Sequence, residues 1–374
     1  MITPNWYASV MGTGIVATAA ASLPVTVPGL RPVATVVWAL AAIVLVAVVV
    51  ASVRRGLGHR DDPVLLHFWG APPMALLTVG AGTLLLGRDW IGTPAAVAVD
   101  LVLWTAGTVA GLIVAVAVPY RMMVHRPATG GDAFGGWLMP VVPPMVSAAT
   151  GALLVPHVPD GRDLLLACYA LAGVSLIAAF VVLTQIWARL IRHRVGPAAT
   201  VPTLWIVLGP LGQSVTAFHL LGKAAPGVLP DPYATGAQVF ALLYGVPVLG
   251  FALFWAALAA AVTVRTARAG LPFSLTWWSF TFPVGTVVTG ASGLAVRSGS
   301  PLLTVLSLLL YAALVAAWAV VAVRTGRLVL SRPSARPAPQ PAPARPVSRP
   351  AAAHPAPHQA APQSAAFSPA GPRR

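Results

Sequence analysis

Apolar stretches, each about long enough to cross a bilayer, alternate along the chain with short polar connections. A spanning helix needs roughly 20 apolar residues, because the hydrocarbon core is about 30 Å thick and each residue adds about 1.5 Å. The pattern predicts an all-α polytopic membrane protein with ten transmembrane helices. They are expected at Trp6–Leu23, Val33–Val53, Val64–Leu86, Pro94–Pro119, Trp137–Val155, Leu164–Ala188, Val201–Leu221, Tyr233–Val264, Pro272–Val296 and Leu302–Val323.

The odd-numbered predicted helices are interrupted by glycine or proline near mid-membrane, whereas most even-numbered ones are not. Proline removes a backbone N–H and frees a carbonyl, which hydrocarbon tolerates only where the break faces protein or a water-filled cavity. We therefore expect five helical hairpins around a central pore lined by the odd-numbered helices. The alternative is that these residues serve only close helix packing. The expected kinked or pore-lining positions are Gly12, Thr13, Gly14, Pro73, Pro143, Pro144, Gly209, Pro210 and Pro283.

Charge is scarce and unevenly placed. Of 374 residues, 57% are hydrophobic and 8% charged, which excludes a soluble protein. Ten Lys and Arg residues follow even-numbered helices, five follow odd-numbered ones, and eight lie from Arg324 onward. The positive-inside rule predicts that both termini are cytoplasmic, and the expected location is the plasma membrane. The net charge of +15 thus sets orientation and does not indicate a nucleic-acid partner.

The C-terminal segment differs from the rest of the chain. Residues 331–374 are rich in Pro, Ala and Arg and nearly free of large apolar side chains. Such a composition cannot bury enough surface to fold. The sequence therefore predicts a transmembrane domain over residues 1–330 and a disordered cytoplasmic tail over residues 331–374.

The expected interior is uncharged. The chain has eight aspartates and no glutamate, and none lies on an interrupted helix; Asp100 falls near the outer end of the fourth helix. Hydroxyls are frequent on the interrupted helices, at Ser9, Thr13, Thr78, Ser147, Thr150, Ser214, Thr216, Thr281, Thr286 and Thr289, with Gln213 beside them. A neutral, hydroxyl-lined path suits anions or neutral solutes, although Ser and Thr also hydrogen-bond between helices.

Few residues have the spacing of a reactive site. His67 and His219 lie near helix ends, where a proton-linked role, an anion-attracting role and interfacial packing all remain open. The histidines show no metal-ligand spacing, and Gly12-Thr13-Gly14 is not a phosphate loop, since no strand precedes it. We expect no catalytic residues, no metal and no cofactor.

Two sequence strings resemble a known family. Trp6 followed by Met11-Gly12-Thr13-Gly14-Ile15, and Trp277-Trp278-Ser279-Phe280-Thr281-Phe282-Pro283, are similar to the tellurite-resistance/dicarboxylate transporter family. The family includes bacterial tellurite-resistance proteins, fungal malate and sulfite transporters and plant slow-type anion channels. The resemblance covers roughly Pro4–Arg324.

The resemblance implies five hairpins around a pore, a homotrimer with one pore per subunit, and a phenylalanine of the ninth helix that plugs the pore. By its place in the motif Phe282 is the expected gate, with Phe280 as the fallback. An aromatic residue beside a proline kink also simply fills space, so this alternative stays open.

Two transport hypotheses follow. The first is a passive, channel-like protein that moves small anions across the plasma membrane. The second is a secondary carrier of C4-dicarboxylates or sulfite. The absence of a carboxylate from the interrupted helices argues against proton coupling in such a carrier. The sequence does not distinguish malate, sulfite, chloride, nitrate or tellurite-related anions. Flux measurements also separate both hypotheses from a purely structural membrane protein.

Overall fold

The fold is a bundle of α-helices. A computed structural model describes residues 2–58, 64–124 and 132–331. In these residues the secondary structure is helical apart from an isolated bridge between Ile2 and Leu57, which confirms the all-α prediction. The predicted tail lies outside the described residues except for Ser331, as do the loop arginines Arg60 and Arg126.

The two sets of predicted helices have different local structures. The even-numbered set forms long continuous α-helices: α2 (Leu30–Arg55), α5 (Thr93–Val124), α7 (Gly161–His193), α9 (Tyr233–Arg268) and α11 (Pro301–Leu330). The odd-numbered set forms shorter α-helices: α1 (Tyr7–Ser22), α3 (Ala71–Gly82), α6 (Pro143–Leu154), α8 (Leu208–Ala224) and α10 (Phe282–Ser298). We call these the outer and inner helices, for the reason given below.

Each inner helix follows a 3₁₀ segment. The five segments are η1 (Pro4–Trp6), η2 (His67–Gly70), η4 (Gly135–Leu138), η6 (Ala198–Val207) and η8 (Leu275–Phe280). Short elements complete the chain: the π-helical η3 (Thr83–Gly87), α4 (Arg88–Ile91), η5 (Val155–His157) and η7 (Ala225–Gly227). At Pro73, Pro143, Pro210 and Pro283 the predicted interruptions lie near a change from 3₁₀ to α geometry, whereas Gly12, Thr13 and Gly14 lie inside the continuous α1.

The prolines lie at the start of the inner α-helices. Pro73, Pro143 and Pro283 occupy first-turn positions directly after the 3₁₀ segments or the turns that follow them. In the first turn of an α-helix the N–H lacks an intrahelical partner, so proline costs little there. Two outer helices contain an internal proline, Pro119 in α5 and Pro247 in α9, so proline alone does not identify an inner helix.

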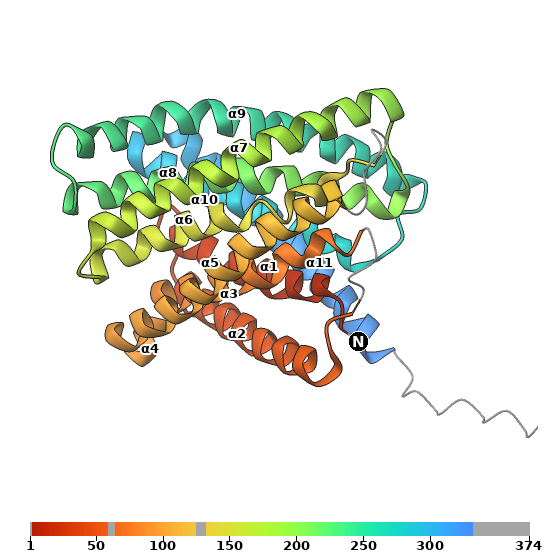
Figure 1. Ribbon diagram of the computed structural model, residues 1–374, viewed down its shortest axis with the longest axis horizontal. Helices are drawn as coiled ribbons and strands as arrows, with labels where there is room; N and C mark the ends of the chain where they lie inside the picture. The colour runs from red at the N-terminus through yellow and green to blue at the C-terminus, as the bar shows by residue number, and fades with distance from the viewer. Residues whose placement is uncertain (1, 59–63, 125–131, 332–374) are drawn as a thin grey trace, which may run out of the picture. The chain divides into compact units, whose positions relative to one another are not determined.

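The inner helices form a closed ring. Contacts link α1 to α3, α3 to α6, α6 to α8, α8 to α10 and α10 back to α1. Each outer helix packs against the inner helix before it in the chain, as α2 does on α1. It also packs against the next inner helix around the ring, as α11 does on α1. Figure 1 shows α7 and α9 along one side of this bundle and α2 along the opposite side. Five helical hairpins thus surround one axis.

Burial separates the two sets. Eight helical segments of the described residues are long and apolar enough to cross a membrane, while α1 and α6 are shorter. In the apolar stretch of the five outer helices 17% to 33% of residues are buried, against 83% to 89% in the three inner spans. Exposed apolar side chains on the outer helices therefore face lipid, and the protein is a multi-pass membrane protein.

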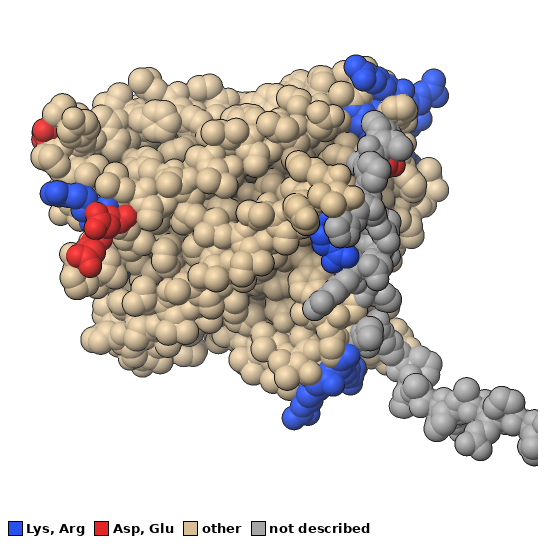
Figure 2. Space-filling view, in the orientation of Figure 1, with Lys and Arg blue, Asp and Glu red and all other residues tan. Residues whose placement is uncertain are grey.

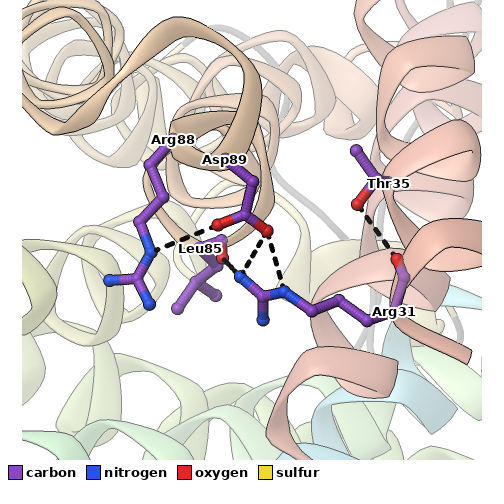
Figure 3. A network of polar contacts seen from close by, with 5 residues as sticks. All are labelled: Arg31, Thr35, Leu85, Arg88 and Asp89. Atoms are coloured by element: carbon purple, nitrogen blue, oxygen red, sulfur yellow. Dashed lines mark hydrogen bonds and ion pairs between the residues drawn. The ribbon is translucent and has the colours of Figure 1, made fainter. Parts of the chain in front are cut away.

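Charged side chains mark the two ends of the bundle. On the face shown in Figure 2 they gather at two opposite ends, and the broad band between them shows none. One end carries α4, and we call it the α4 end; the other carries Pro4 and the last turn of α2, and we call it the N-terminal end. At the α4 end, Arg31 joins Asp89 at 2.7 Å, and Arg88 lies 4.0 Å from Asp89 (Figure 3).

Candidate functional site: a divided path through the inner helices

The inner helices enclose two cavities that share one side chain. The larger cavity, toward the α4 end, has a volume of about 570 Å³, and the smaller, toward the N-terminal end, about 20 Å³. Phe282, the first residue of α10, lines both and is 3% exposed. The larger cavity reaches the surface, because the exposed Lys223 and Val296 belong to its wall.

All five inner helices contribute one face to the larger cavity. Most residues along each face recur at spacings of three, four or seven, the periods of one or two helical turns. The faces comprise Ile15, Thr18 and Ser22 of α1, Thr78 and Ala81 of α3, Val146, Ala149 and Thr150 of α6, Gln213, Thr216, His219 and Lys223 of α8, and Phe282, Thr289, Gly293 and Arg297 of α10. The wall is thus apolar and hydroxyl-bearing in its depth and basic near the surface.

The hydroxyls of this wall are already engaged. Each lies 2.7 to 3.4 Å from a backbone carbonyl of its own preceding turn, at Thr18, Ser22, Thr78, Thr150, Thr216 and Thr289. A hydroxyl has one proton to donate, so these groups present mainly acceptor lone pairs to the cavity. They keep the wall polar but offer an anion few donors.

The smaller cavity is apolar and narrow. Three methionine side chains line it with Phe68 and Trp278: Met11, Met74 and Met139. A cavity needs about 10 to 15 Å³ to hold one water molecule, so about 20 Å³ holds a single water and excludes any hydrated anion. In this conformation the path is closed to ions on the N-terminal side of Phe282.

Close packing of α1 fixes the backbone beside Phe282. A Cβ on Gly12 would lie 2.3 Å from Thr281 Oγ1, and a Cβ on Gly285 would lie 2.3 Å from Ile15 Cγ1. Thr281 is the junction between η8 and α10, and its hydroxyl donates to Trp278 O at 2.7 Å. The two glycines therefore let α1 and α10 approach each other at the turn that carries Phe282.

The remaining predicted positions divide between the path and the packing around it. Gly209 and Pro283 line the smaller cavity. Gly14 packs against Thr78, and Thr13 Oγ1 accepts a hydrogen bond from Trp318 of α11. Pro73 and Pro143 both pack near Gly111 of α5, Pro144 is buried in α6, and Pro210 packs in a crevice with Leu176 and Ala179 of α7. Most of the prolines thus contact outer helices.

Phe280, the fallback gate, lies in an aromatic cluster. Its ring packs edge-on against Trp205 of η6 and Trp277 of η8, with centroids 5.7 Å apart in both pairs. The ring is half-buried, whereas that of Phe282 is enclosed. The two phenylalanines of the motif therefore have different surroundings, and Phe282 is the one between the cavities.

Three basic side chains near the surface of the larger cavity were assigned by sequence to helix ends or loops. His219 and Lys223 lie one turn apart on α8, and Arg297 lies one turn beyond Gly293 on α10. A Cβ on Gly293 would lie 2.6 Å from the His219 ring, so this ring rests on the α10 backbone. A sequence signal existed, since α8 and α10 both end at this side with a basic residue in the last turn.

Asp100 is the exception to an uncharged interior. It lies in α5, is 0% exposed, and neither carboxyl oxygen has a hydrogen-bond partner among the described residues. A Cβ on Gly80 of α3 would lie 2.5 Å from Asp100 Oδ1. The sequence placed this residue near the helix end, but its side chain is enclosed between an outer and an inner helix.

Largely buried inner helices that enclose a polar cavity within a multi-pass bundle are typical of membrane transport proteins. The sequence matches the SLAC1 family, described as voltage-dependent anion channel, over residues 1–326, and the chain belongs to this family. The match confirms the family to which the sequence strings pointed. The family is one of anion transporters.

Known relatives cover most of the chain. A sulfite efflux pump, SSU1, of Trichophyton rubrum is 27% identical over 323 residues, which are 81% of this chain and 84% of the relative. The corresponding pump of Arthroderma otae is 27% identical over 346 residues, 85% of this chain and 88% of the relative. An uncharacterized transporter of Methanocaldococcus jannaschii is 27% identical over 301 residues, 77% and 82% of the two chains. The similarity to each of these relatives thus extends over more than three quarters of this chain.

Proposed function

We propose that this protein conducts small anions passively across the plasma membrane, as a channel with Phe282 as its gate. The observation that carries the proposal is the position of Phe282 between a cavity of about 570 Å³ and one of about 20 Å³. Because Phe282 is the side chain common to both cavities, rotation of its ring out of the path would join them. In its depth the wall is uncharged and its hydroxyls present few donors to an anion, which favours passage over tight binding there.

The proposed orientation places the α4 end outside the cell and both termini in the cytoplasm. It rests on the excess of basic residues in the loops after the even-numbered helices. The larger cavity then opens outward, and Phe282 separates it from the cytoplasmic side. Modification of Ser298→Cys and Ala269→Cys by an impermeant thiol reagent, in a Cys168→Ala background, tests this orientation. The thiol of the Ser298→Cys variant must react from outside intact cells, and that of the Ala269→Cys variant only after lysis.

The gate is tested by current through purified protein in a planar bilayer. Phe282→Ala should raise anion conductance at least tenfold, because it removes the one side chain common to both cavities. Phe280→Ala is the matched control, since it removes the same ring from the cluster with Trp205 and Trp277 and should leave conductance near the wild-type value. Equal conductance of Phe282→Ala and wild type would contradict the gate, and cation-selective reversal potentials would contradict the function.

A secondary carrier is the second candidate function. Two observations favour it: relatives are named sulfite efflux pumps, and the path is wide on one side of Phe282 only, as an alternating-access intermediate would be. The carrier hypothesis extends to C4-dicarboxylates such as malate. Saturable flux of radiolabelled sulfite with counterflow in proteoliposomes would establish it, whereas ohmic flux without counterflow would support the channel.

The proposed assembly is a homotrimer with one path per subunit, as the resemblance implies. The apolar outer helices offer lipid-facing surface for such contacts, for example the exposed Ile43 and Val46 of α2. Native mass spectrometry from detergent should give three chains per particle. A monomer of undiminished conductance would contradict the trimer without affecting the single-chain path.

A further inference from the structure

The larger cavity has an unequal distribution of hydrogen-bond donors. Its six hydroxyls each lie within hydrogen-bond distance of a backbone carbonyl, as described above. By contrast, no hydrogen bond within the described residues uses the side chain of Lys223 or Arg297, and Arg297 Nε is buried without a partner. The strongest unused donors of the cavity are therefore these cations near its opening.

The positions of these cations converge. His219 and Lys223 are separated by one turn of α8, and Gly293 and Arg297 by one turn of α10, the inner helix that packs most closely on α8. Gly293 admits the His219 ring against the α10 backbone, which brings the two helix ends together. One cavity opening thus carries an imidazole, an ammonium and a guanidinium from two adjacent helices.

The aspartates at this end of the bundle lie outside the cavity wall, including the exposed Asp160 and Asp163 at the start of α7. Asp89 is paired with Arg31 and lies beside Arg88 (Figure 3). Asp231 accepts hydrogen bonds from Thr235. No carboxylate belongs to the wall of the larger cavity within the described part of the chain, so the field of Lys223 and Arg297 is not neutralised there.

From this arrangement we propose that His219, Lys223 and Arg297 form an anion-binding site at the opening of the larger cavity, selective for small oxyanions over halides. The guanidinium fork of Arg297 matches two oxygens of one anion, which a spherical halide cannot supply. The site rests on the proposed function, which it deepens by assigning the place where the anion binds before or after it passes Phe282.

The two last-turn cations also have an electrostatic role that must be separated from binding. Lys223 and Arg297 lie in the last turns of α8 and α10, where a positive charge stabilises the helix dipole. Loss of that role lowers the stability of the protein without anion. Loss of a binding site instead lowers the stabilisation that an added anion gives. The two effects are therefore measured separately.

The test combines binding and flux in the full-length protein. In detergent, sulfite or malate should raise the unfolding temperature of wild type by mass action, and chloride at equal ionic strength should raise it less. Arg297→Gln should weaken the apparent affinity for sulfite or malate about tenfold, the effect of losing one charge-assisted contact, and that for chloride less than twofold. His219→Gln and Lys223→Gln should give smaller losses with the same selectivity.

Matched controls exclude diffuse surface charge. Arg88→Gln and Arg162→Gln each remove one positive charge from the α4 end without touching the cavity wall, and should leave both affinities unchanged. In proteoliposomes, Arg297→Gln in a Phe282→Ala background should raise the half-saturating sulfite concentration by the same factor as in the binding assay.

Three results would overturn the site: an unchanged sulfite affinity in Arg297→Gln, an equal loss in Arg88→Gln, or equal weakening for chloride and sulfite. A second outcome separates the two proposals: no variant shows flux, yet sulfite still stabilises wild type and no longer stabilises Arg297→Gln. That outcome would reject the proposed conduction but support the site. Flux whose half-saturating sulfite concentration is the same with and without Arg297→Gln would support the conduction but reject the site.

Discussion

The inner spans are less apolar than the outer helices, and the two sets are built for different surroundings. Outer helices such as α7 are continuous, and their apolar faces are exposed to lipid. Inner helices such as α6 begin only after a 3₁₀ segment and a turn, and are buried on all sides. A backbone surrounded by other helices can leave α geometry, because neighbouring protein satisfies the freed polar groups, whereas lipid cannot.

Glycines of the 3₁₀ segments and lipid-side glycines of the outer helices have different surroundings. In the 3₁₀ segments a Cβ on Gly70 would lie 1.9 Å from Met139 O, and one on Gly135 would lie 1.8 Å from Thr203 O. Successive segments of the inner ring thus touch backbone to backbone. In the outer helices, by contrast, Gly173 and Gly236 have no atom within 4 Å of such a Cβ. Glycine is required at the two 3₁₀ positions and is only tolerated at Gly173 and Gly236, although Gly107, Gly111 and Gly245 of the outer helices do pack closely on inner helices.

The largest effect should therefore come from Gly135→Ala. The added methyl would overlap the Thr203 carbonyl, and backbone cannot move aside as a flexible side chain would. We expect a loss of about 3 kcal/mol or more of stability, at the upper end of overpacking, seen as loss of monodisperse protein on gel filtration. Gly173→Ala is the matched control and should be neutral or stabilising by up to about 1 kcal/mol. Equal behaviour of the two variants would remove the distinction between the sets.

A second prediction concerns the one carboxylate enclosed between the sets. Asp100 of α5 is fully buried without a hydrogen-bond partner in the described residues, so it costs stability. Asp100→Ala should raise the free energy of unfolding by about 1 to 3 kcal/mol, and Asp100→Asn by less, since the amide is also unpaired. Thermal unfolding in detergent checks this.

The outcome for Asp100 also bears on function. An ionisable residue inside a membrane is costly and is usually retained for a purpose. A stabilised Asp100→Ala variant with reduced anion flux would show that the carboxylate is kept for transport. A destabilised variant would contradict the prediction and show that the carboxylate is satisfied by a bound water or ion.

Much of this fold is visible in the sequence because it depends on local chemistry. Apolar length predicted all ten helical regions, and glycine and proline identified the inner set, as the burial of α3, α8 and α10 shows. The sequence did not predict that Pro73 and Pro283 begin α-helices after 3₁₀ segments, because an interruption in sequence does not show which geometry precedes it.

The site was less predictable than the fold, because the rotation of each helix about its own axis decides which residues face the cavity. Thr13 was expected to line the path but accepts a hydrogen bond from Trp318, on the opposite side of α1 from Thr18, which does line the cavity. Thr18, Lys223 and Arg297 were not proposed at all, since their role depends on five helices ending around one opening. The motif around Phe282 was informative, because one short stretch of sequence contains the side chain at which both cavities meet.

The smallest expected effect concerns the ion pair that links the two sets at the surface. Arg31 at the start of α2 joins Asp89 of α4, and the two side chains are 49% and 41% exposed (Figure 3). Arg31 Nη2 also donates to Leu85 O at 3.1 Å, which ties an outer helix to the end of an inner span. A double-mutant cycle of Arg31→Gln and Asp89→Asn should give a coupling energy of about 0.2 to 1 kcal/mol, because water screens an exposed pair. The coupling should fall further in 1 M salt, where the screening length is about 3 Å. A coupling well above that range would mean that water does not screen the pair to the degree that its exposure implies.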